Sequence, residues 1–308
     1  MPAYCEREES PYFYRMKPIH ISLAILCAAI WGFVFVVIDW GLSEIPPLLF
    51  TALRFAVCAA FLPFIGFKPP VAWRYIIGVG ISLGMLQFGL YMGMAYGMPA
   101  GLASLVNQTQ AFFTVMLAAL WLGDRPSVRQ LAGIAVAFLG IAVIAADLPA
   151  GGTQLGLMLC VVGAMFWAVS NVLMKVSKPP QVFVMMIWMS LIPPIPLCIA
   201  SYYFEGPQGF SGLLTMSPTA WFAVFYSSVI ATILGFGLWG YLLKQYTASI
   251  VAPFSMLVPV FGIGFAVTLL GEELSPVKLG ACGIILAGLA LTLLPSRRPP
   301  VVAAAHAR

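Results

Sequence analysis

Residues 18–40 read PIHISLAILCAAIWGFVFVVIDW, and Asp39 is the one Asp, Glu, Lys or Arg among them. A helix needs about 20 mainly apolar residues to cross the hydrocarbon core of a bilayer. The stretch follows a tail that holds both acidic and basic residues, and no small-residue cleavage site accompanies it. It therefore predicts an uncleaved first membrane span rather than a signal peptide.

The same pattern recurs along the chain. Of the 308 residues, 62% are hydrophobic and 8% are charged, whereas soluble domains are roughly 45–50% apolar and about 25% charged. A membrane β-barrel would alternate polar and apolar residues, and these runs do not alternate. We therefore predict an all-α integral membrane protein with ten transmembrane helices, at residues 18–40, 45–67, 73–96, 100–122, 126–147, 153–176, 181–204, 217–243, 247–270 and 275–295.

The basic residues indicate the orientation of this bundle. Lys278 falls on one side of the ten spans, and Arg54 lies inside a span. Cytoplasmic loops of membrane proteins carry an excess of Lys and Arg, so we expect cytoplasmic tails at residues 1–17 and 296–308. The thirteen residues on the side of these tails are Arg7, Arg15, Lys17, Lys68, Arg74, Arg125, Arg129, Lys175, Lys178, Lys244, Arg297, Arg298 and Arg308.

An internal repeat divides the chain. The motif GDRPS at residues 123–127 has a counterpart, GEELS, at residues 271–275, which is 148 residues later. Matched Gly and Leu are common in apolar sequence, so a chance repeat is the alternative. Copies of five helices each, an odd number, would have opposite orientations in the membrane. We predict inverted five-helix repeats at residues 18–147 and 153–295, with a solute site where they meet near the midplane.

The third span carries glycines at Gly80, Gly84, Gly89, Gly93 and Gly97, mostly four residues apart. Small residues at this spacing allow two helix backbones to approach closely, and packing is a principal attraction between helices in lipid. We interpret them as a packing face. The alternative is a surface along which helices slide during transport.

Polar side chains at membrane depth are costly and therefore informative. Residues 107–110, Asn-Gln-Thr-Gln, lie inside the fourth span. Successive helical residues point about 100° apart, so we expect Asn107 and Gln110, three apart, to reach a solute first. Hydrogen bonding between helices is the alternative for each of them. The full set of candidate solute contacts is Gln87, Tyr91, Asn107, Gln110, Trp167, Asn171, Tyr226 and Ser255.

Arg54 is a cation well inside the second span. It could bind a carboxylate or form a gating or structural ion pair with Asp39 or Glu44. The alternative is that the side chain extends toward the membrane surface or binds helix ends.

Several function classes find no support in the sequence. No Ser-His-Asp set, phosphate-binding loop or cluster of metal ligands is present, and His20 and His306 are the two histidines. The basic residues form no stripe with aromatics, so nucleic-acid binding is not expected. We expect neither enzymatic activity nor a metal or other cofactor; the partners would be a small-molecule solute and the lipid bilayer.

Specific runs carry a family resemblance over residues 18–295. They are GMPAGLASL at 97–105, QAFFT at 110–114 and APFSMLVPV at 252–260. The chain resembles the EamA branch of the drug/metabolite transporter superfamily, and these runs are most similar to bacterial exporters of cysteine, O-acetylserine and other amino acids. The resemblance implies a bacterial inner-membrane location and an alternating-access cycle around a central cavity.

The chain also departs from this family. Members often have Asn and then Lys in the first span, where this sequence has Val34 and Asp39, while Asn171 and Lys175 stand at the equivalent places in the sixth span. We predict a secondary transporter that exports amino acids or related small metabolites, because neutral donors and acceptors suit a small zwitterion. The alternatives are a multidrug or nucleotide-sugar carrier and a non-transporting membrane scaffold or sensor.

Overall fold

The computed structural model describes residues 16–124, 126–148, 152–246, 248–273 and 275–293, and every regular element within them is a helix. The C-terminal tail, all but two residues of the N-terminal tail, Arg125 and Leu274 lie outside these residues. The elements of the first half are α1 Pro18–Leu42, α2 Pro47–Ala59, α3 Leu62–Ile65, α4 Trp73–Ala95, α5 Ala100–Asn107, α6 Gln110–Leu122 and α7 Val128–Asp147. Those of the second half are α8 Gly152–Ser177, α9 Val182–Met189, α10 Pro194–Phe204, α11 Gln208–Gly212, η1 Leu213–Thr215, α12 Pro218–Phe225, η2 Tyr226–Leu234, α13 Gly235–Gln245, α14 Ala248–Val251, η3 Ala252–Met256, α15 Leu257–Leu270 and α16 Pro276–Leu293.

These elements make ten crossings of the bundle. Among the described residues, nine helical segments are long and apolar enough to span a membrane, and the tenth, Pro276–Thr292, is a shorter apolar helix. Each crossing begins and ends within two residues of its predicted position. The predicted all-α membrane fold with ten spans is therefore confirmed.

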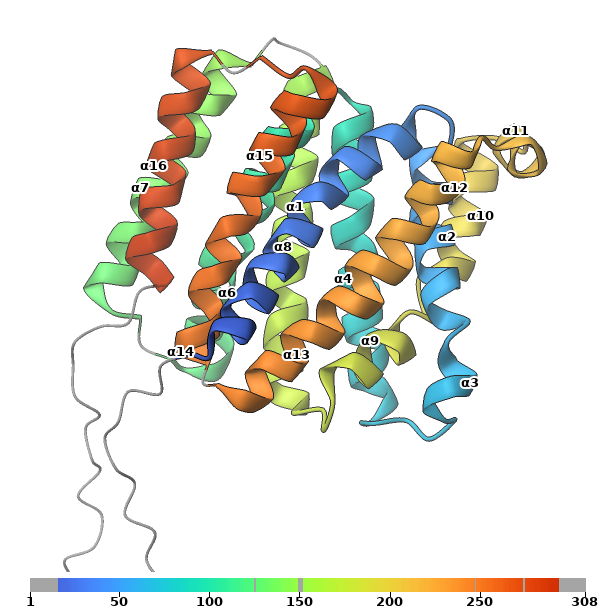
Figure 1. Cartoon of the computed structure of the whole chain (residues 1–308), viewed down its shortest axis with the longest axis horizontal. Helices are drawn as coiled ribbons and strands as arrows, with labels where there is room; N and C mark the ends of the chain where they lie inside the picture. The colour runs from blue at the N-terminus through green and yellow to red at the C-terminus, as the bar shows by residue number, and fades with distance from the viewer. Residues whose placement is uncertain (1–15, 125, 149–151, 247, 274, 294–308) are drawn as a thin grey trace, which may run out of the picture.

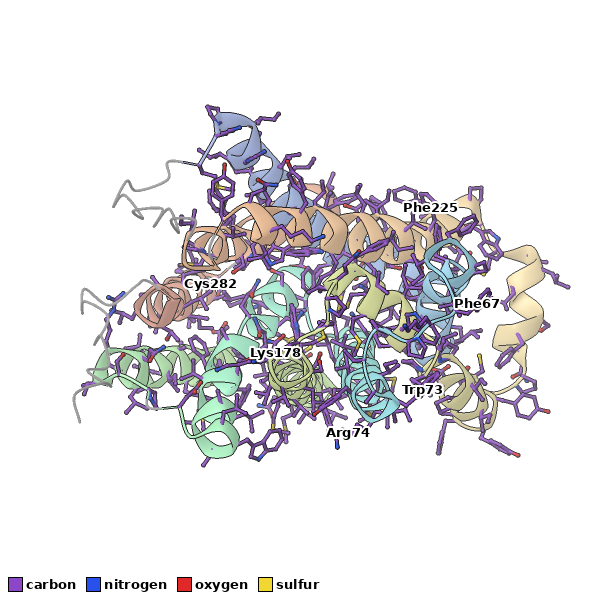
Figure 2. The ribbon with its side chains drawn as sticks, turned by 90° about the horizontal axis from the view of Figure 1, so that it is seen from below. Phe67, Trp73, Arg74, Lys178, Phe225 and Cys282 are labelled. Carbon is purple, nitrogen blue, oxygen red and sulfur yellow. The ribbon has the colours of Figure 1, made fainter. Side chains whose placement is uncertain are left out.

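The two halves run in opposite directions. The first helix, α1, starts at the end of the bundle where α16 stops, which is the lower end in Figure 1 and is called the terminal end below. The first helix of the second half, α8, starts at the opposite end, called the far end. Figure 2 is viewed from the terminal end, where the exposed side chains of Arg74 and Lys178 lie.

Glycines bring α4 and α8 into close contact. A Cβ atom on Gly89 would lie 2.5 Å from the carbonyl oxygen of Leu159, and one on Gly93 would lie 2.5 Å from Sγ of Cys160. A Cβ on Gly80 would meet Cβ of Ile192 at 2.7 Å. The glycine face of the third span is thus a packing face in this structure, as small residues at this spacing favour.

Five crossings are not continuous α-helices. The second is interrupted at Ala60 and Phe61, between α2 and α3, and proline explains two of the other four breaks. Pro193 and Pro194 begin α10 after the chain leaves α9 at Met189. Pro253 lies in η3, a 3₁₀ turn between α14 and α15. Proline has no N–H to donate to the preceding turn, which accounts for both breaks.

The breaks in the fourth and eighth crossings have other causes. The fourth crossing is interrupted because Gln108 and Thr109 donate their N–H groups three residues back, to Leu105 and Val106. The Thr109 hydroxyl also donates to the Val106 carbonyl at 2.7 Å, and such local bonds compete with helical ones. In the eighth crossing η2 has π-helical geometry, a wide turn that is frequent at functional sites.

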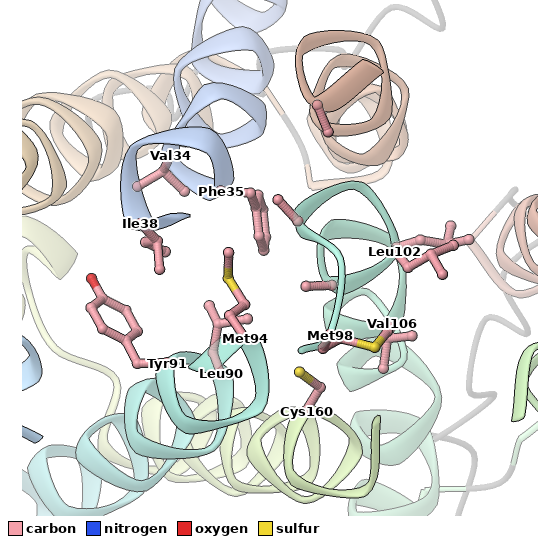
Figure 3. Packing of buried hydrophobic residues seen from close by; sticks show 14 of the residues in the cluster. Val34, Phe35, Ile38, Leu90, Tyr91, Met94, Met98, Leu102, Val106 and Cys160 are labelled. Carbon is pink, nitrogen blue, oxygen red and sulfur yellow. The ribbon is translucent and has the colours of Figure 1, made fainter. Parts of the chain in front are cut away.

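The largest buried cluster fills the far half of the bundle. Its members include residues of α5, of the second halves of α1 and α4 and of the first half of α8 (Figure 3). Those labelled in Figure 3 are Val34, Phe35, Ile38, Leu90, Tyr91, Met94, Met98, Leu102, Val106 and Cys160.

Candidate functional site

A cavity of about 280 Å³ lies between the two halves of the chain, adjacent to the far-half cluster. Both halves contribute side chains, from α1, α2, α4, α5 and α6 on one side and from α8, α9, η2, α13, η3 and α15 on the other. Six of the eight candidate solute contacts line it. They are Gln87, Asn107, Gln110, Trp167, Asn171 and Ser255.

Amide side chains bridge the two halves at this cavity. Nδ2 of Asn171, on α8, donates to Oε1 of Gln110 at 2.6 Å and to Oγ1 of Thr114 at 3.1 Å, both on α6. The Thr114 hydroxyl donates to the Gln110 carbonyl at 2.7 Å. This network fixes the Gln110 side chain. Gln110 therefore forms an interhelical hydrogen bond and also faces the cavity.

Three amide side chains at the break between α5 and α6 face the cavity. Asn107, Gln108 and Gln110 all line it, and Nε2 of Gln108 donates to the Ser255 carbonyl at 3.3 Å. A regular helix would have pointed Gln108 elsewhere, which is why the sequence did not single it out. Thr109 is fully buried and directs its hydroxyl to the backbone instead.

Arg54 lines the cavity with a side chain that is 7% exposed. Its Nη1 donates to the Tyr91 hydroxyl at 3.2 Å, and its Nη2 donates to Oγ1 of Thr232 at 3.1 Å. Oγ1 of Thr232 in turn donates to the Ser227 carbonyl at 2.9 Å, across the wide turn of η2. The guanidinium is therefore held by neutral groups from α4 and η2. The part of Thr232 was not predicted, and no local sequence signal marks it.

Two of the candidate contacts do not line the cavity. Tyr91 is fully buried behind Arg54, and its ring packs edge-on against Phe50 with 4.8 Å between centroids. The hydroxyl of Tyr226 donates to the Ile30 carbonyl at 3.1 Å, which ties η2 to α1. Both tyrosines position cavity residues or helices rather than meet the cavity in this structure.

The expected ion pair between Arg54 and Asp39 is not formed here. Asp39 is exposed in the last turn of α1 at the far end, and Arg54 is bound to Tyr91 and Thr232. Within the part of the chain that the structure describes, the ion pair found joins Lys175 and Asp124 at the terminal end, with 2.7 Å between Nζ and Oδ2.

Aromatic rings form an apolar wall of the cavity. Trp31 donates its Nε1 hydrogen to the Ala231 carbonyl at 2.9 Å. Its ring lies 5.2 Å from that of Trp239 and 5.3 Å from that of Phe236, centroid to centroid. All three rings line the cavity with Trp167, so the polar groups face a wall suited to an apolar side chain.

An acidic residue joins the two halves at the far end. The carboxylate of Glu272 accepts hydrogen bonds from the N–H groups of Ala100 and Gly101 at the start of α5. The distance from the Gly101 nitrogen to Oε2 is 3.1 Å. The pKa of Glu272 is raised above its usual value, chiefly because the carboxyl group is buried. The two backbone hydrogen bonds and Lys278 oppose this shift, and Asp39 adds to it. In the sequence Glu272 was noted as part of the repeat, and its contact could not be foreseen.

Comparisons with known proteins agree with this architecture. A family model described as the EamA-like transporter family matches residues 18–146 and 154–294. The "Probable amino-acid metabolite efflux pump" of Escherichia coli (strain K12) is 40% identical over 283 residues, which cover 89% of this chain and 95% of that protein. The protein of the same description from Salmonella typhimurium is also 40% identical, with the same coverage.

More distant relatives cover the chain as fully. The "Uncharacterized inner membrane transporter YedA" of Escherichia coli (strain K12) is 27% identical and covers 92% of each chain. One solved crystal structure, 20% identical, covers 92% of this chain and 100% of its own with a TM-score of 0.61, which shows a shared fold.

Proposed function

Because the chain belongs to the EamA-like transporter family, we propose that it exports amino acids or related small metabolites by alternating access. The observation that carries the proposal is the cavity between the two halves, with amide groups of both halves at its wall. Solute sites of transporters built from repeats commonly lie at such a junction. The description of the relatives that are 40% identical, as probable amino-acid metabolite efflux pumps, supports the same solute class.

The size and charge of the cavity support a small solute. Its volume is about 280 Å³, and Arg54 is the one Lys, Arg, Asp or Glu among its described lining residues. A nucleotide sugar would need several Arg or Lys groups for its diphosphate. Cysteine, O-acetylserine and other neutral or aromatic amino acids meet these limits of size and charge.

We place the protein in a bacterial inner membrane with the terminal end in the cytoplasm. Thirteen of the fifteen Lys and Arg residues fall at that side in the sequence, and basic residues are retained on the cytoplasmic side of membrane proteins. The domain limits proposed are 18–147 and 153–295, joined at the far end.

The test is transport by the purified protein in liposomes, with a panel of neutral amino acids and O-acetylserine as labelled solutes. We expect counterflow of at least one of them above that of empty liposomes. Cells that overproduce the protein should also tolerate an excess of that amino acid better than controls. Movement of a lipophilic dye or a nucleotide sugar, without movement of any amino acid in the panel, would show that the proposal is wrong.

A further inference from the structure

The cavity holds a buried cation without an acidic partner. The described residues supply Arg54 with hydroxyl groups from Tyr91 and Thr232, and no carboxylate of theirs forms an ion pair with it. A buried charge that lacks a counter-charge is strongly destabilising. Such a group in a cavity wall is therefore suited to an anionic ligand, and a guanidinium binds a carboxylate through two parallel hydrogen bonds.

The same cavity holds acceptors without donors. Oε1 of Gln87 and Oδ1 of Asn107 are buried and receive no hydrogen bond from the described residues. Asn107 is 8% exposed, and both residues line the cavity. An unmet buried acceptor is destabilising, and a ligand with N–H donors would satisfy it.

The two kinds of group lie close together. Gln87 and Tyr91 are four residues apart on α4 and share a face, separated by about 6 Å along the helix axis at 1.5 Å per residue. Tyr91 binds Arg54 directly, and Gln87 and Arg54 both line the cavity. Together with Asn107, these groups place a cation and two carbonyl oxygens around one cavity of about 280 Å³.

We propose that Arg54 binds the carboxylate of the solute and that Gln87 and Asn107 accept hydrogen bonds from its ammonium group. The solute class is then a free α-amino acid with an uncharged side chain, which lies against the rings of Trp31, Phe236 and Trp239. This assignment rests on the proposed function and adds the chemical groups that the site requires.

The experiment uses one neutral amino acid that the wild-type protein moves in liposomes, together with its amide and its N-acetyl derivative. The amide lacks the carboxylate charge, and the derivative lacks the ammonium. We expect the free amino acid to compete for transport at least tenfold better than either analogue. Equal competition by the amide would overturn the role of Arg54, while the transport itself would leave the proposed function intact.

Variants separate the residue from its surroundings. Arg54→Gln should abolish the preference for the amino acid over its amide, and Arg54→Lys should retain part of it because Lys keeps the charge but not the planar fork. Arg74→Gln, which removes an exposed arginine at the terminal end, should leave the preference unchanged.

A second readout does not depend on transport. A ligand that binds the folded state raises the unfolding temperature, so the detergent-solubilised wild-type protein is heated with the amino acid, the amide or the derivative. Stabilisation by the amino acid alone would support the site even if no solute moved and the proposed function failed. No stabilisation by any of the three, together with no transport, would overturn both.

A different observation concerns the acidic residues that mark the repeat. Glu272 joins α5 at the far end, whereas Asp124, its counterpart in the first copy, forms an ion pair with Lys175 at the terminal end. The two counterparts therefore make different contacts. The carboxylate at the start of α5 interacts favourably with the positive end of the helix dipole, and the buried cluster fills the same half of the bundle.

We infer that Glu272 is a latch that keeps the far end closed in this structure. Glu272→Ala should open it, and a cysteine introduced by Met98→Cys, at a position that is 2% exposed, should react severalfold faster with a membrane-impermeant thiol reagent. Glu273→Ala, which changes an exposed neighbour, should have no effect. Unchanged reactivity in Glu272→Ala would refute the latch.

A check for unfolding accompanies this test. Cys27 is fully buried in α1, so its labelling would report loss of the fold rather than opening of one end. If Cys27 reacts in Glu272→Ala, the comparison is made with Glu272→Gln, which keeps one acceptor oxygen and loses the charge. Its far-end reactivity should lie between those of the wild type and a fully opened protein, and wild-type reactivity there would again refute the latch.

Discussion

Single polar side chains set the inner surface of this bundle. Asn171 shows the constraint clearly, since its amide donates to both Gln110 and Thr114 across the junction of the two halves. A polar group at membrane depth is costly when it lacks a hydrogen-bond partner. Its substitutions should therefore change stability and transport together.

Asn171→Ala should lower the free energy of unfolding by about 1–2 kcal/mol, the value of a buried hydrogen bond and the penalty for the acceptor that it leaves. Transport should fall because the Gln110 side chain is no longer fixed. Unfolding is measured by denaturant titration in detergent, and transport in liposomes. Gln154→Ala, which removes an exposed amide from the same helix, is the control, and equal effects of the two changes would contradict the assignment.

At the scale of elements, helix contacts depend on the absence of side chains. The α4–α8 contact places backbone against backbone, because Gly89 and Gly93 leave room for Leu159 and Cys160. In lipid the attraction between helices comes largely from such packing. A methyl group in this contact forces two long helices apart along their length.

Gly89→Ala should destabilise the protein by about 1–3 kcal/mol, as overpacking of a well-packed core does. Its new Cβ would lie 2.5 Å from the Leu159 carbonyl and 3.0 Å from Cα of Gly163. Gly283→Ala is the matched control, because a Cβ at that position of α16 meets nothing within 4 Å. The two unfolding temperatures, measured in the same detergent, decide the matter: similar values would show that α4 and α8 tolerate separation.

On the scale of the whole molecule, the opposite directions of the two halves give the bundle two different ends. The terminal end carries both the start of α1 and the end of α16, and α11 lies at the far end (Figure 1). The protein therefore exposes different segments on the two sides of a membrane. Cysteine chemistry can distinguish these sides.

Cys5, in the tail outside the described residues, should react with an impermeant thiol reagent only after the membrane is permeabilised. Ser211→Cys, at an exposed position in α11, should react in intact cells. Labelling of Cys5 in intact cells would reverse the proposed orientation. The Cys5→Ser variant gives the background from the other cysteines, of which Cys27, Cys58, Cys160 and Cys282 are buried and Cys198 is partly exposed.

The architecture of this protein could be predicted largely from the sequence. Runs such as residues 18–40 and 73–96 specify membrane helices because their backbone groups must be satisfied within each segment, and this requirement is local. Prolines indicate two of the five helix breaks for the same reason. The breaks at Gln108–Thr109 and in η2 were not predicted. Local hydrogen bonds of the Thr109 and Thr232 hydroxyl groups accompany them, and such bonds are too weak to set the backbone without the packing of neighbouring helices.

The site depended on the tertiary structure to a greater extent. Residue type and membrane depth identified Gln87, Asn107 and Asn171, since polar groups are rare there. Neither could reveal that Tyr91 lies behind Arg54, or that Arg54 also binds Thr232, which is 178 residues away. The amino-acid sequence by itself determined which segments cross the membrane, because that follows from hydropathy along the chain. Only the packing of the two halves decided which polar groups face the cavity, because helix rotation and helix contacts set those directions.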